Sequence, residues 1–389
     1  MQKTLDLFAG PGGWDVHDAE LGLVTDGVEL DTAARATRDA AGLRTVHDDV
    51  TTYYLPENHG YTGLKASPVC TSFSAAGHGR GREQLDTVLE QLEHTYLTSY
   101  VNHTCFLDEH TSLILEPMRL IADACHFGEP FRWIVMEQVP YALPVWEAYA
   151  GYLRELGYSA VCGALQAEQY GVPQTRRRAV LLASLDRTVS LPEPTHSKYH
   201  NRTPERLDAG VLPWVSMGQA LGWGLDWRPS PTITGGGTAT GGAEPIAKLS
   251  RYSSDPGWRF AGAGATSEQT AGQVPRDPTQ PAHTVTGKGT AAWLSTSTMP
   301  NATHRPADAP APTVAFGKDA ASYVFHNGES NIREAKANRH VRRISVAEAA
   351  VLQTFPAGYP WQGSKTQQYQ QVGNAIPPLL AKAILQQVV

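Results

Sequence analysis

The sequence predicts an α/β protein whose larger part is a doubly wound, mainly parallel sheet and whose smaller part is irregular and β-rich. Two observations predict this fold class. Strand and helix signals alternate up to about residue 184, and the composition then shifts to Pro, Gly, Thr and Ser between about residues 190 and 340. Alternating strands and helices are typical of βαβ units, which form parallel sheets covered by helices. We therefore expect three parts, namely 1–189, 190–340 and 341–389.

The elements of the first part follow one another along the chain. "KTLDLFAGPGGWDVH" is an apolar strand-like run, a glycine-rich turn and a helix-like stretch, as at the start of a βαβ unit. "GLVTDGVELD" and "GLRTVHDDV" predict the next short strands, each ending in acidic residues. "RWIVMEQVP" predicts a buried strand, "VWEAYAGYLREL" a helix, and "YSAVCGALQA" and "RAVLLAS" two further strands. Leucines at helical spacing between about 83 and 107 indicate a helical insertion.

The remaining parts carry weaker signals. The second part contains a loose repeat, "PSPTITGGGTA", "PAHTVTGKGTA" and "PAPTVAFGKDA", in which each copy predicts a short strand running into a tight turn. In the third part Ser345 and Glu348 predict a capping box at the start of a helix. The chain ends in "QVGNAIPPLLAKAILQQVV", which predicts a Gly-Asn turn and then a helix that starts at proline.

The composition predicts an intracellular protein that can present a basic surface. No run of about 18 apolar residues appears, and the N-terminus lacks a basic, apolar leader. The four cysteines form no C-x-x-C pair, which fits a reduced compartment. The net charge is −6, but residues 170–345 hold 20 Lys and Arg against 13 Asp and Glu. A basic half suits a nucleic-acid face, although an ordinary solvated surface explains the charge equally well.

Cys70 lies in "ASPVCTSFSAAGHGRG", a loop of Pro, Ser, Ala and Gly. A single cysteine is more often buried and inert than reactive. Small residues cannot build a core around a thiol, however, and they suit a loop that carries one. The choice between the two interpretations depends on the rest of the chain.

Six motifs, in this order, resemble those of the S-adenosylmethionine-dependent DNA (cytosine-5)-methyltransferases: "DLFAGPGG", "VELD", "PVCTSFS", "MEQVP", "QTRRR" and "GNAIPP". The resemblance implies a Rossmann-like methyltransferase domain over 1–189, a target-recognition domain over 190–340, and a segment over 341–389 that returns to the catalytic domain. It also implies double-stranded DNA as the substrate, with the target base flipped out of the duplex.

The resemblance further implies a site for S-adenosylmethionine at the strand ends. Glycines in the first motif allow a sharp turn and a close approach to a ligand. We expect Glu29 to accept hydrogen bonds from the ribose hydroxyls and Asp49 to accept one from the adenine amino group, although both could be solvated acids. The expected cofactor-binding residues are Phe8, Gly10, Gly12, Gly13, Glu29, Asp49 and Asn374.

For catalysis, the resemblance implies that Cys70 adds to carbon 6 of cytosine, so that carbon 5 can attack the methyl group. A free thiol has a pKa near about 8.5, and we expect Arg176 and Arg178 to lower the pKa of Cys70. Glu137 is expected to polarise the ring through nitrogen 3 and the exocyclic amine, and Arg178 to contact the base oxygen. The residues expected to support the loop and the substrate are Pro68, Ser74 and Gln174.

Three positions depart from the family pattern. Val69 and Thr71 flank Cys70 where the family has Pro and Gln, and Gln138 replaces the usual Asn. Two alternatives therefore stay open. One is a sequence-specific DNA-binding protein that keeps the fold without the chemistry, and the other is a tRNA cytosine-5 methyltransferase of the same fold.

We expect a cytoplasmic monomer from a prokaryote, or from a virus in a prokaryotic host, with no membrane partner. A cognate restriction endonuclease is a candidate partner. No metal site is expected, because the histidines and the cysteine near the insertion match no zinc spacing. These residues are His94, His103, Cys105 and His110.

Overall fold

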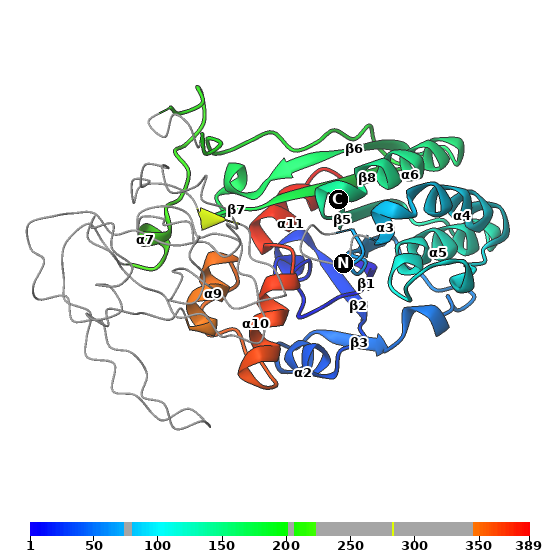
Figure 1. Ribbon diagram of the computed structural model, residues 1–389, viewed down its shortest axis with the longest axis horizontal. Helices are drawn as coiled ribbons and strands as arrows, with labels where there is room; N and C mark the ends of the chain where they lie inside the picture. The colour runs from blue at the N-terminus through cyan, green and yellow to red at the C-terminus, as the bar shows by residue number, and fades with distance from the viewer. Residues whose placement is uncertain (74–79, 201–205, 223–281, 284–344) are drawn as a thin grey trace, which may run out of the picture.

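The computed structural model describes residues 1–73, 80–200, 206–222, 282–283 and 345–389 (Figure 1). The predicted supporting residue Ser74 lies outside the described residues. The same holds for most of the predicted target-recognition domain, including its three repeats except for Ala282–His283.

Seven strands form one sheet in the order β3-β2-β1-β4-β5-β8-β6. All neighbouring pairs are parallel except the two that β8 makes, which are antiparallel. The prediction of a doubly wound, mainly parallel α/β domain is therefore confirmed. The strands are β1 (Gln2–Leu7), β2 (Leu23–Val28), β3 (Arg44–His47), β4 (Gly63–Ala66), β5 (Trp133–Gln138), β6 (Ser159–Gln166) and β8 (Arg177–Ser184).

Helices cover both faces of the sheet because the central strands are apolar on both sides. In β5, Ile134 and Met136 join one hydrophobic core, whereas Trp133 and Val135 join the other. This alternation follows from the period of two of an extended strand. The first core is shared with α4 (Leu85–Thr98), α5 (Glu116–His126) and α6 (Leu143–Glu155), and the second with α11 (Pro378–Leu385).

The predicted helical insertion is confirmed as α4, which packs beside α5 and α6 (Figure 1). Val88 and Leu92 are fully buried in the first core, and Tyr96 stacks on Tyr152 of α6 with ring centroids 4.6 Å apart. The helix ends at Thr98, and the next residue, Ser99, has a left-handed φ of +52°. The insertion is thus an integral layer of the fold.

The C-terminal segment forms helices, and two of them begin with a capping box. The predicted capping box of Ser345 and Glu348 is present at the start of α9 (Val346–Leu352). The predicted Gly-Asn turn is wrong, because Gly373 and Asn374 are the last residues of α10 (Lys365–Asn374). A second capping box, between Ser364 and Gln367, starts this helix and was missed from the sequence.

The shorter elements complete the described structure. In the described part of the chain, no helix is both long and apolar enough to cross a bilayer. The short helices are α1 (Asp18–Leu21), α2 (Thr32–Ala40), α3 (Arg80–Glu83) and α7 (Met217–Ala220), the short strands are β7 (Gln174–Thr175) and β9 (Ala282–His283), and the 3₁₀ turns are η1 (Val50–Thr52), η2 (His103–Cys105), η3 (Thr111–Leu115), η4 (Pro140–Ala142) and η5 (Ala167–Tyr170).

Candidate active site

The predicted site residues gather at one edge of the sheet. The parallel strands β1, β2, β4 and β5 all end at this edge, and their last residues lead directly into the glycine loop, Glu29, the Cys70 loop and Glu137. Because β8 is antiparallel to β5, its first residues lie at the same edge. Ligands of open α/β sheets bind at the carboxyl ends of the strands, which makes this edge the candidate site.

The glycine loop after β1 is a left-handed turn. Phe8, Gly10 and Gly12 have φ values of +59°, +53° and +100°. The turn aims the Gly10 amide at Glu29, whose Oε2 accepts its hydrogen bond at 2.7 Å. Phe8 is half-buried and packs against the first hydrophobic core. The chain therefore turns sharply here, as the motif predicts.

Position 13 must be glycine because the C-terminal segment packs directly against it. A Cβ atom at this position would lie 2.6 Å from the backbone carbonyl oxygen of Ile376, which no side chain tolerates. The loop is held a second time by the hydroxyl of Tyr359, which donates to the carbonyl of Pro11 at 2.5 Å. The "GNAIPP" motif thus packs directly on the glycine loop, although Asn374 itself is exposed.

Glu29 is half-buried at the end of β2, where its two carboxylate oxygens accept from the amides of Gly10 and Asp31 at 2.7 and 2.8 Å. Burial raises the pKa of Glu29, and the two amides partly offset that rise. Asp49 caps η1, since its Oδ1 accepts from the amide and the hydroxyl of Thr51. Both acids lie at strand ends, as predicted, and the carboxylate of each accepts hydrogen bonds from backbone amides.

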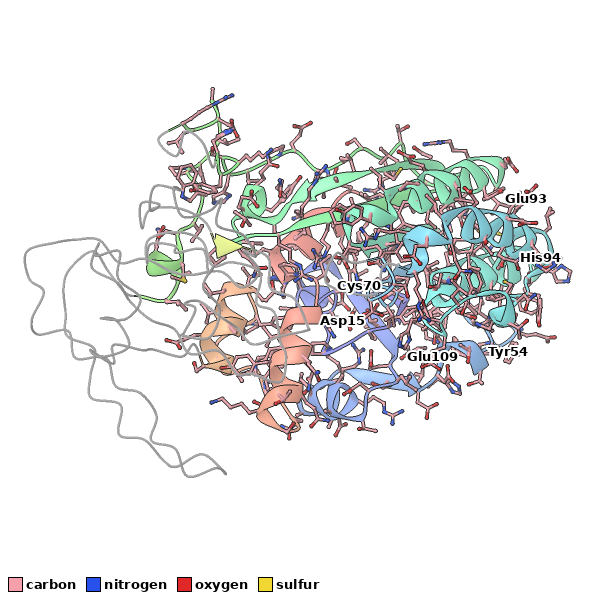
Figure 2. The ribbon with its side chains drawn as sticks, viewed as in Figure 1. Asp15, Tyr54, Cys70, Glu93, His94 and Glu109 are labelled. Atoms are coloured by element: carbon pink, nitrogen blue, oxygen red, sulfur yellow. The ribbon has the colours of Figure 1, made fainter. Side chains whose placement is uncertain are left out.

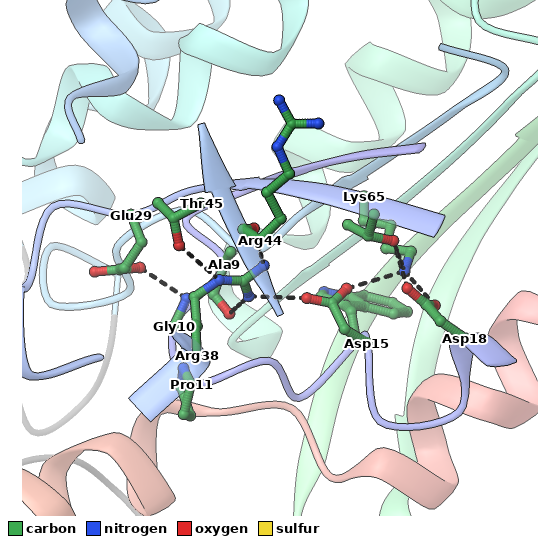
Figure 3. Close-up of polar contacts among 12 residues, drawn as sticks. Ala9, Gly10, Pro11, Asp15, Asp18, Glu29, Arg38, Arg44, Thr45 and Lys65 are labelled. Carbon is green, nitrogen blue, oxygen red and sulfur yellow. Dashed lines mark hydrogen bonds and ion pairs between the residues drawn. The ribbon is translucent and has the colours of Figure 1, made fainter. Parts of the chain in front are cut away.

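A buried charge network lies beneath the glycine loop, and sequence analysis missed it (Figure 3). Arg38 of α2 donates to Asp15 Oδ2 at 2.8 Å and to the carbonyl of Ala9 at 3.3 Å. Lys65 of β4 donates to Asp15 Oδ1 at 3.0 Å and to Asp18 Oδ1 at 2.5 Å. The side chains of Arg38, Lys65 and Asp15 are completely buried. The network therefore fixes the loop from below.

Cys70 is half-buried in the loop after β4 and lies near the middle of the molecule in Figure 2. Burial raises the pKa of its thiol, Arg178 lowers it, Glu137 raises it and Arg176 lowers it, with a net rise. Both arginines therefore act on the pKa of Cys70 in the expected direction, but the pKa is raised overall because desolvation of the thiolate outweighs their charge.

Glu137 and Arg178 form a buried ion pair. Arg178 Nε lies 2.5 Å from Glu137 Oε1, and both side chains are less than one-tenth exposed. The register explains the contact. Glu137 pairs with Val180 across the antiparallel strands, and Arg178 lies two residues before Val180 on the same face of β8. Arg177, between the two buried arginines, is exposed, because successive side chains of an extended strand point to opposite faces.

Arg176 and Gln174 hold the C-terminal segment against the site. Arg176 is fully buried and donates to the carbonyl of Gly373 at 2.9 Å. The side-chain amide of Gln174 donates to Gln353 Oε1 at 2.9 Å, and Gln353 donates in turn to the carbonyl of Val372 at 2.7 Å. Sequence analysis missed Gln353, which no motif contains.

Gln138 holds the start of the Cys70 loop. Its side-chain amide donates to the carbonyl of Pro68 at 2.9 Å, and its Oε1 accepts from the amide of Val139 at 2.8 Å. Both groups are buried, so these hydrogen bonds are shielded from water. The residue that departs from the family pattern thus connects the end of β5 to the loop of Cys70.

Comparisons with known proteins show the family of the chain. The C-5 cytosine-specific DNA methylase family model matches residues 102–389. The type II methyltransferase M.SacI of Streptomyces achromogenes is 24% identical over 416 residues, covering 98% of this chain and 91% of the relative. M.BsuRI of Bacillus subtilis is 28% identical over 59% of this chain and 41% of its own length.

Solved structures show the same fold. The Dnmt2 methyltransferase of S. pombe has a TM-score of 0.52 and 15% identity over 100% of this chain and 98% of its own. The methyltransferase EhMeth of Entamoeba histolytica has a TM-score of 0.51 and 11% identity over 99% and 97%. The match to the family model covers more than half of the sequence. The chain belongs to the C-5 cytosine-specific DNA methylase family and is a DNA (cytosine-5)-methyltransferase.

Proposed function

We propose that the chain methylates carbon 5 of cytosine within a specific double-stranded DNA sequence, with the target base flipped out and Cys70 as a transient covalent nucleophile. One observation carries the proposal. Cys70, the Glu137–Arg178 ion pair and Arg176 meet at the sheet edge that also holds the glycine loop. A thiol, a carboxylate and two guanidinium groups at one site are the groups that the addition to a pyrimidine needs.

The residues at the first two strand ends fit S-adenosylmethionine, the cofactor of the family. Glu29 is half-buried beside the left-handed turn at Gly10, so its carboxylate can reach hydroxyl donors of a ligand. Phe8 offers an aromatic face at the same end of β1. When bound, the cofactor supplies an electrophilic methyl group. We infer that Glu29 and Asp49 orient it and that the glycine loop allows its close approach.

The protein groups act on the base. The Cys70 thiolate forms a bond to carbon 6, and the electrons of the 5,6 double bond move to carbon 5. Carbon 5 would take the methyl group as the bond from that group to the sulfonium sulfur breaks and the sulfur leaves as a neutral thioether. Loss of the proton on carbon 5 to water then restores the double bond, as the bond from Cys70 to carbon 6 breaks and releases the thiolate. Glu137 holds the edge with nitrogen 3 and the amine, while Arg178 stabilises the charge that develops on the ring.

The relatives M.SacI and M.BsuRI are named type II methyltransferases. We infer from them that this enzyme modifies one DNA sequence in the cytoplasm of a prokaryotic cell and protects it from a cognate endonuclease. The predicted region 190–340 would read that sequence, with arginines on both sides of it, at 177 and 342–343, to contact phosphates.

The test begins with expression in a bacterial host that lacks its own cytosine-5 methyltransferases. Methylome sequencing should show 5-methylcytosine at one recognition sequence. The purified protein should then transfer a labelled methyl group to a duplex with that sequence, and Cys70→Ser should lose at least about 10³-fold in rate. A duplex that carries 5-fluorocytosine should trap a covalent adduct. Full activity in Cys70→Ser would overturn the mechanism, and methylation of tRNA instead of DNA would overturn the substrate.

A further inference from the structure

The insertion that contains α4 closes on itself next to the Cys70 loop. The backbone amide of Leu107, near its end, donates to the side chain of Gln84, at its beginning, at 2.8 Å. The carbonyl of Leu107 accepts from Arg80 Nη1 at 2.7 Å. Figure 2 shows that the outer part of α4, at Glu93 and His94, lies far from Cys70. The base of the insertion, and not its outer end, therefore adjoins the loop.

Asp108 follows Leu107 at the base of the insertion, and its side chain contacts the Cys70 loop. Its Oδ1 accepts from the hydroxyl of Ser72 at 2.9 Å, across 36 positions of sequence. The same carboxylate caps η3 by accepting from the amides of His110 and Thr111 at 2.9 and 2.8 Å. Burial acts to raise the pKa of Asp108, but the hydrogen bonds from Thr111 and Ser72 outweigh it, so the pKa is lowered. An ionised, well-anchored acceptor thus meets Ser72, which is 3% exposed.

The segments before and after residues 74–79 are also joined to each other. The amide of Gly81 donates to the carbonyl of Ser72 at 3.0 Å, and the fully buried ring of Phe73 lies 2.9 Å from the position that a Cβ atom of Gly81 would take. The amide of Phe73 donates to the carbonyl of Cys70 at 3.1 Å. Ser72 is two residues from Cys70, so a constraint on Ser72 restricts the position of the thiol.

We propose that the base of the insertion (Gln84, Leu107 and Asp108) is a positioning device for Cys70. Asp108 acts through Ser72, and Leu107 acts through Arg80, so that the two sides of the loop are held to one rigid layer of helices. The device keeps the thiol beside Arg178 and half-shielded from solvent. The inference rests on the proposed role of Cys70 as the nucleophile.

Ser72→Ala tests the device, because it removes the hydrogen bond to Asp108 and leaves the cap of η3 intact. The single-turnover rate of adduct formation on the 5-fluorocytosine duplex should fall by about 10-fold, since small displacements of a reacting atom are costly. Equilibrium binding of the duplex and of S-adenosylmethionine should stay within about 2-fold of wild type. Arg80→Gln should act in the same direction from the other side of the loop. Asp86→Asn, at an exposed position of α4, is the matched control and should change nothing.

A double-mutant cycle separates the device from general stability. Asp108→Ala removes the cap as well, and Ser72→Ala should add nothing to its effect on the adduct rate. Asp108→Asn, which keeps an acceptor for Ser72, should recover most of the rate. A Ser72→Ala variant that reacts at the wild-type rate, or that loses binding and adduct formation equally, would overturn the proposal.

Alkylation of Cys70 by iodoacetamide, followed by peptide mass spectrometry, tests the device without DNA. Release of the loop should expose the thiol and raise its alkylation rate at least about 3-fold in Ser72→Ala, while the adduct rate falls. Equal alkylation rates would refute the device even if the wild-type protein formed no adduct. A lack of adduct in the wild-type protein would instead refute the proposed function, so the two failures are distinguishable.

Discussion

Burial and the neighbouring arginines act in opposite directions on the pKa of Cys70. Its burial disfavours the thiolate, and this effect exceeds the attraction of Arg178 and Arg176. Glu137, paired with Arg178, adds repulsion. In the mechanism that we propose, a flipped base would occupy the carboxylate and leave the guanidinium groups to act on the sulfur. That mechanism predicts a thiol that its substrate activates.

The pH dependence of Cys70 alkylation measures this balance. In wild-type protein without DNA, the midpoint of the rate profile should lie above the ordinary value of a thiol, because the pKa is raised. Arg178→Gln removes a positive charge and should move the midpoint further up, whereas Glu137→Gln removes a negative charge and should move it down. Cys70→Ser identifies the signal by abolishing it. Shifts of the same sign in both variants would contradict the assignment of charges around the sulfur.

Gln138 shows what a departure from a motif can mean at the level of one residue. The sequence marks it as unusual, together with Val69, and leaves the effect on the loop open. In the structure the amide of Gln138 donates to the carbonyl of Pro68, two residues before Cys70. Its partner is a backbone atom, which no side-chain pattern reveals, so this contact could not be predicted from the sequence.

At the scale of elements, six strands of the sheet could be predicted, most of them because they are short apolar runs bounded by Gly, Pro or acidic residues. β4 (Gly63–Ala66) was missed, because its four residues are too few to give a pattern. The direction of β8 in the sheet could not be predicted, because an apolar run does not show whether its strand is parallel or antiparallel to its neighbours. This direction decides the site, because an antiparallel β8 brings Arg178 to the end of β5, whereas a parallel one would place it at the opposite edge. The buried network of Arg38, Lys65 and Asp15 was also beyond prediction, because its members are up to 50 residues apart.

The connection between β7 and the C-terminal helices gives a prediction at the same scale. Gln353 is fully buried and joins Gln174 to the carbonyls of Val372 and Ala375. Gln353→Leu removes the hydrogen bonds of the Gln353 side chain to Gln174 and to these two carbonyls, and it should lower the free energy of unfolding by about 2–3 kcal/mol.

Urea denaturation monitored by circular dichroism measures this loss for Gln353→Leu. Gln370→Leu, the same substitution at an exposed position of α10, serves as the control and should shift the free energy by less than about 0.5 kcal/mol. Equal effects of the two variants would show that the buried amide does not join the C-terminal segment to the site.

At the scale of the whole molecule, the charge network joins the glycine loop and α2 to the sheet. Among the residues that the structure describes, three carboxyl groups, Asp6, Asp15 and Asp18, share a buried region with two cations, Lys65 and Arg38. Asp6 is completely buried, and neither of its oxygens has a hydrogen-bond partner among the described residues. Burial, and then repulsion by Asp15, raise the pKa of Asp6 well above its ordinary value. A neutral Asp6 leaves two negative charges facing two positive ones.

This balance makes stability depend on pH in a defined direction. In the unfolded chain Asp6 loses its proton near pH 4, whereas in the native protein it keeps the proton to a higher pH. The native state therefore binds more protons above pH 4, and the free energy of unfolding falls as the pH rises toward the native pKa. Asp18, whose pKa is raised to about 6, contributes in the same direction between about pH 4 and pH 6.

Asp6→Asn isolates the first contribution, because an amide mimics the protonated carboxyl and does not titrate. The free energy of unfolding of Asp6→Asn relative to wild type should increase as the pH rises from 4.5 toward the native pKa of Asp6, as followed by urea denaturation at several pH values. The contribution of Asp18 is common to both proteins and cancels in the difference. Asp39→Asn, at an exposed position of α2, should give a difference that does not change with pH. A constant difference for Asp6→Asn as well would mean that Asp6 is charged in the native protein, so that three carboxylates face Lys65 and Arg38 beneath the glycine loop.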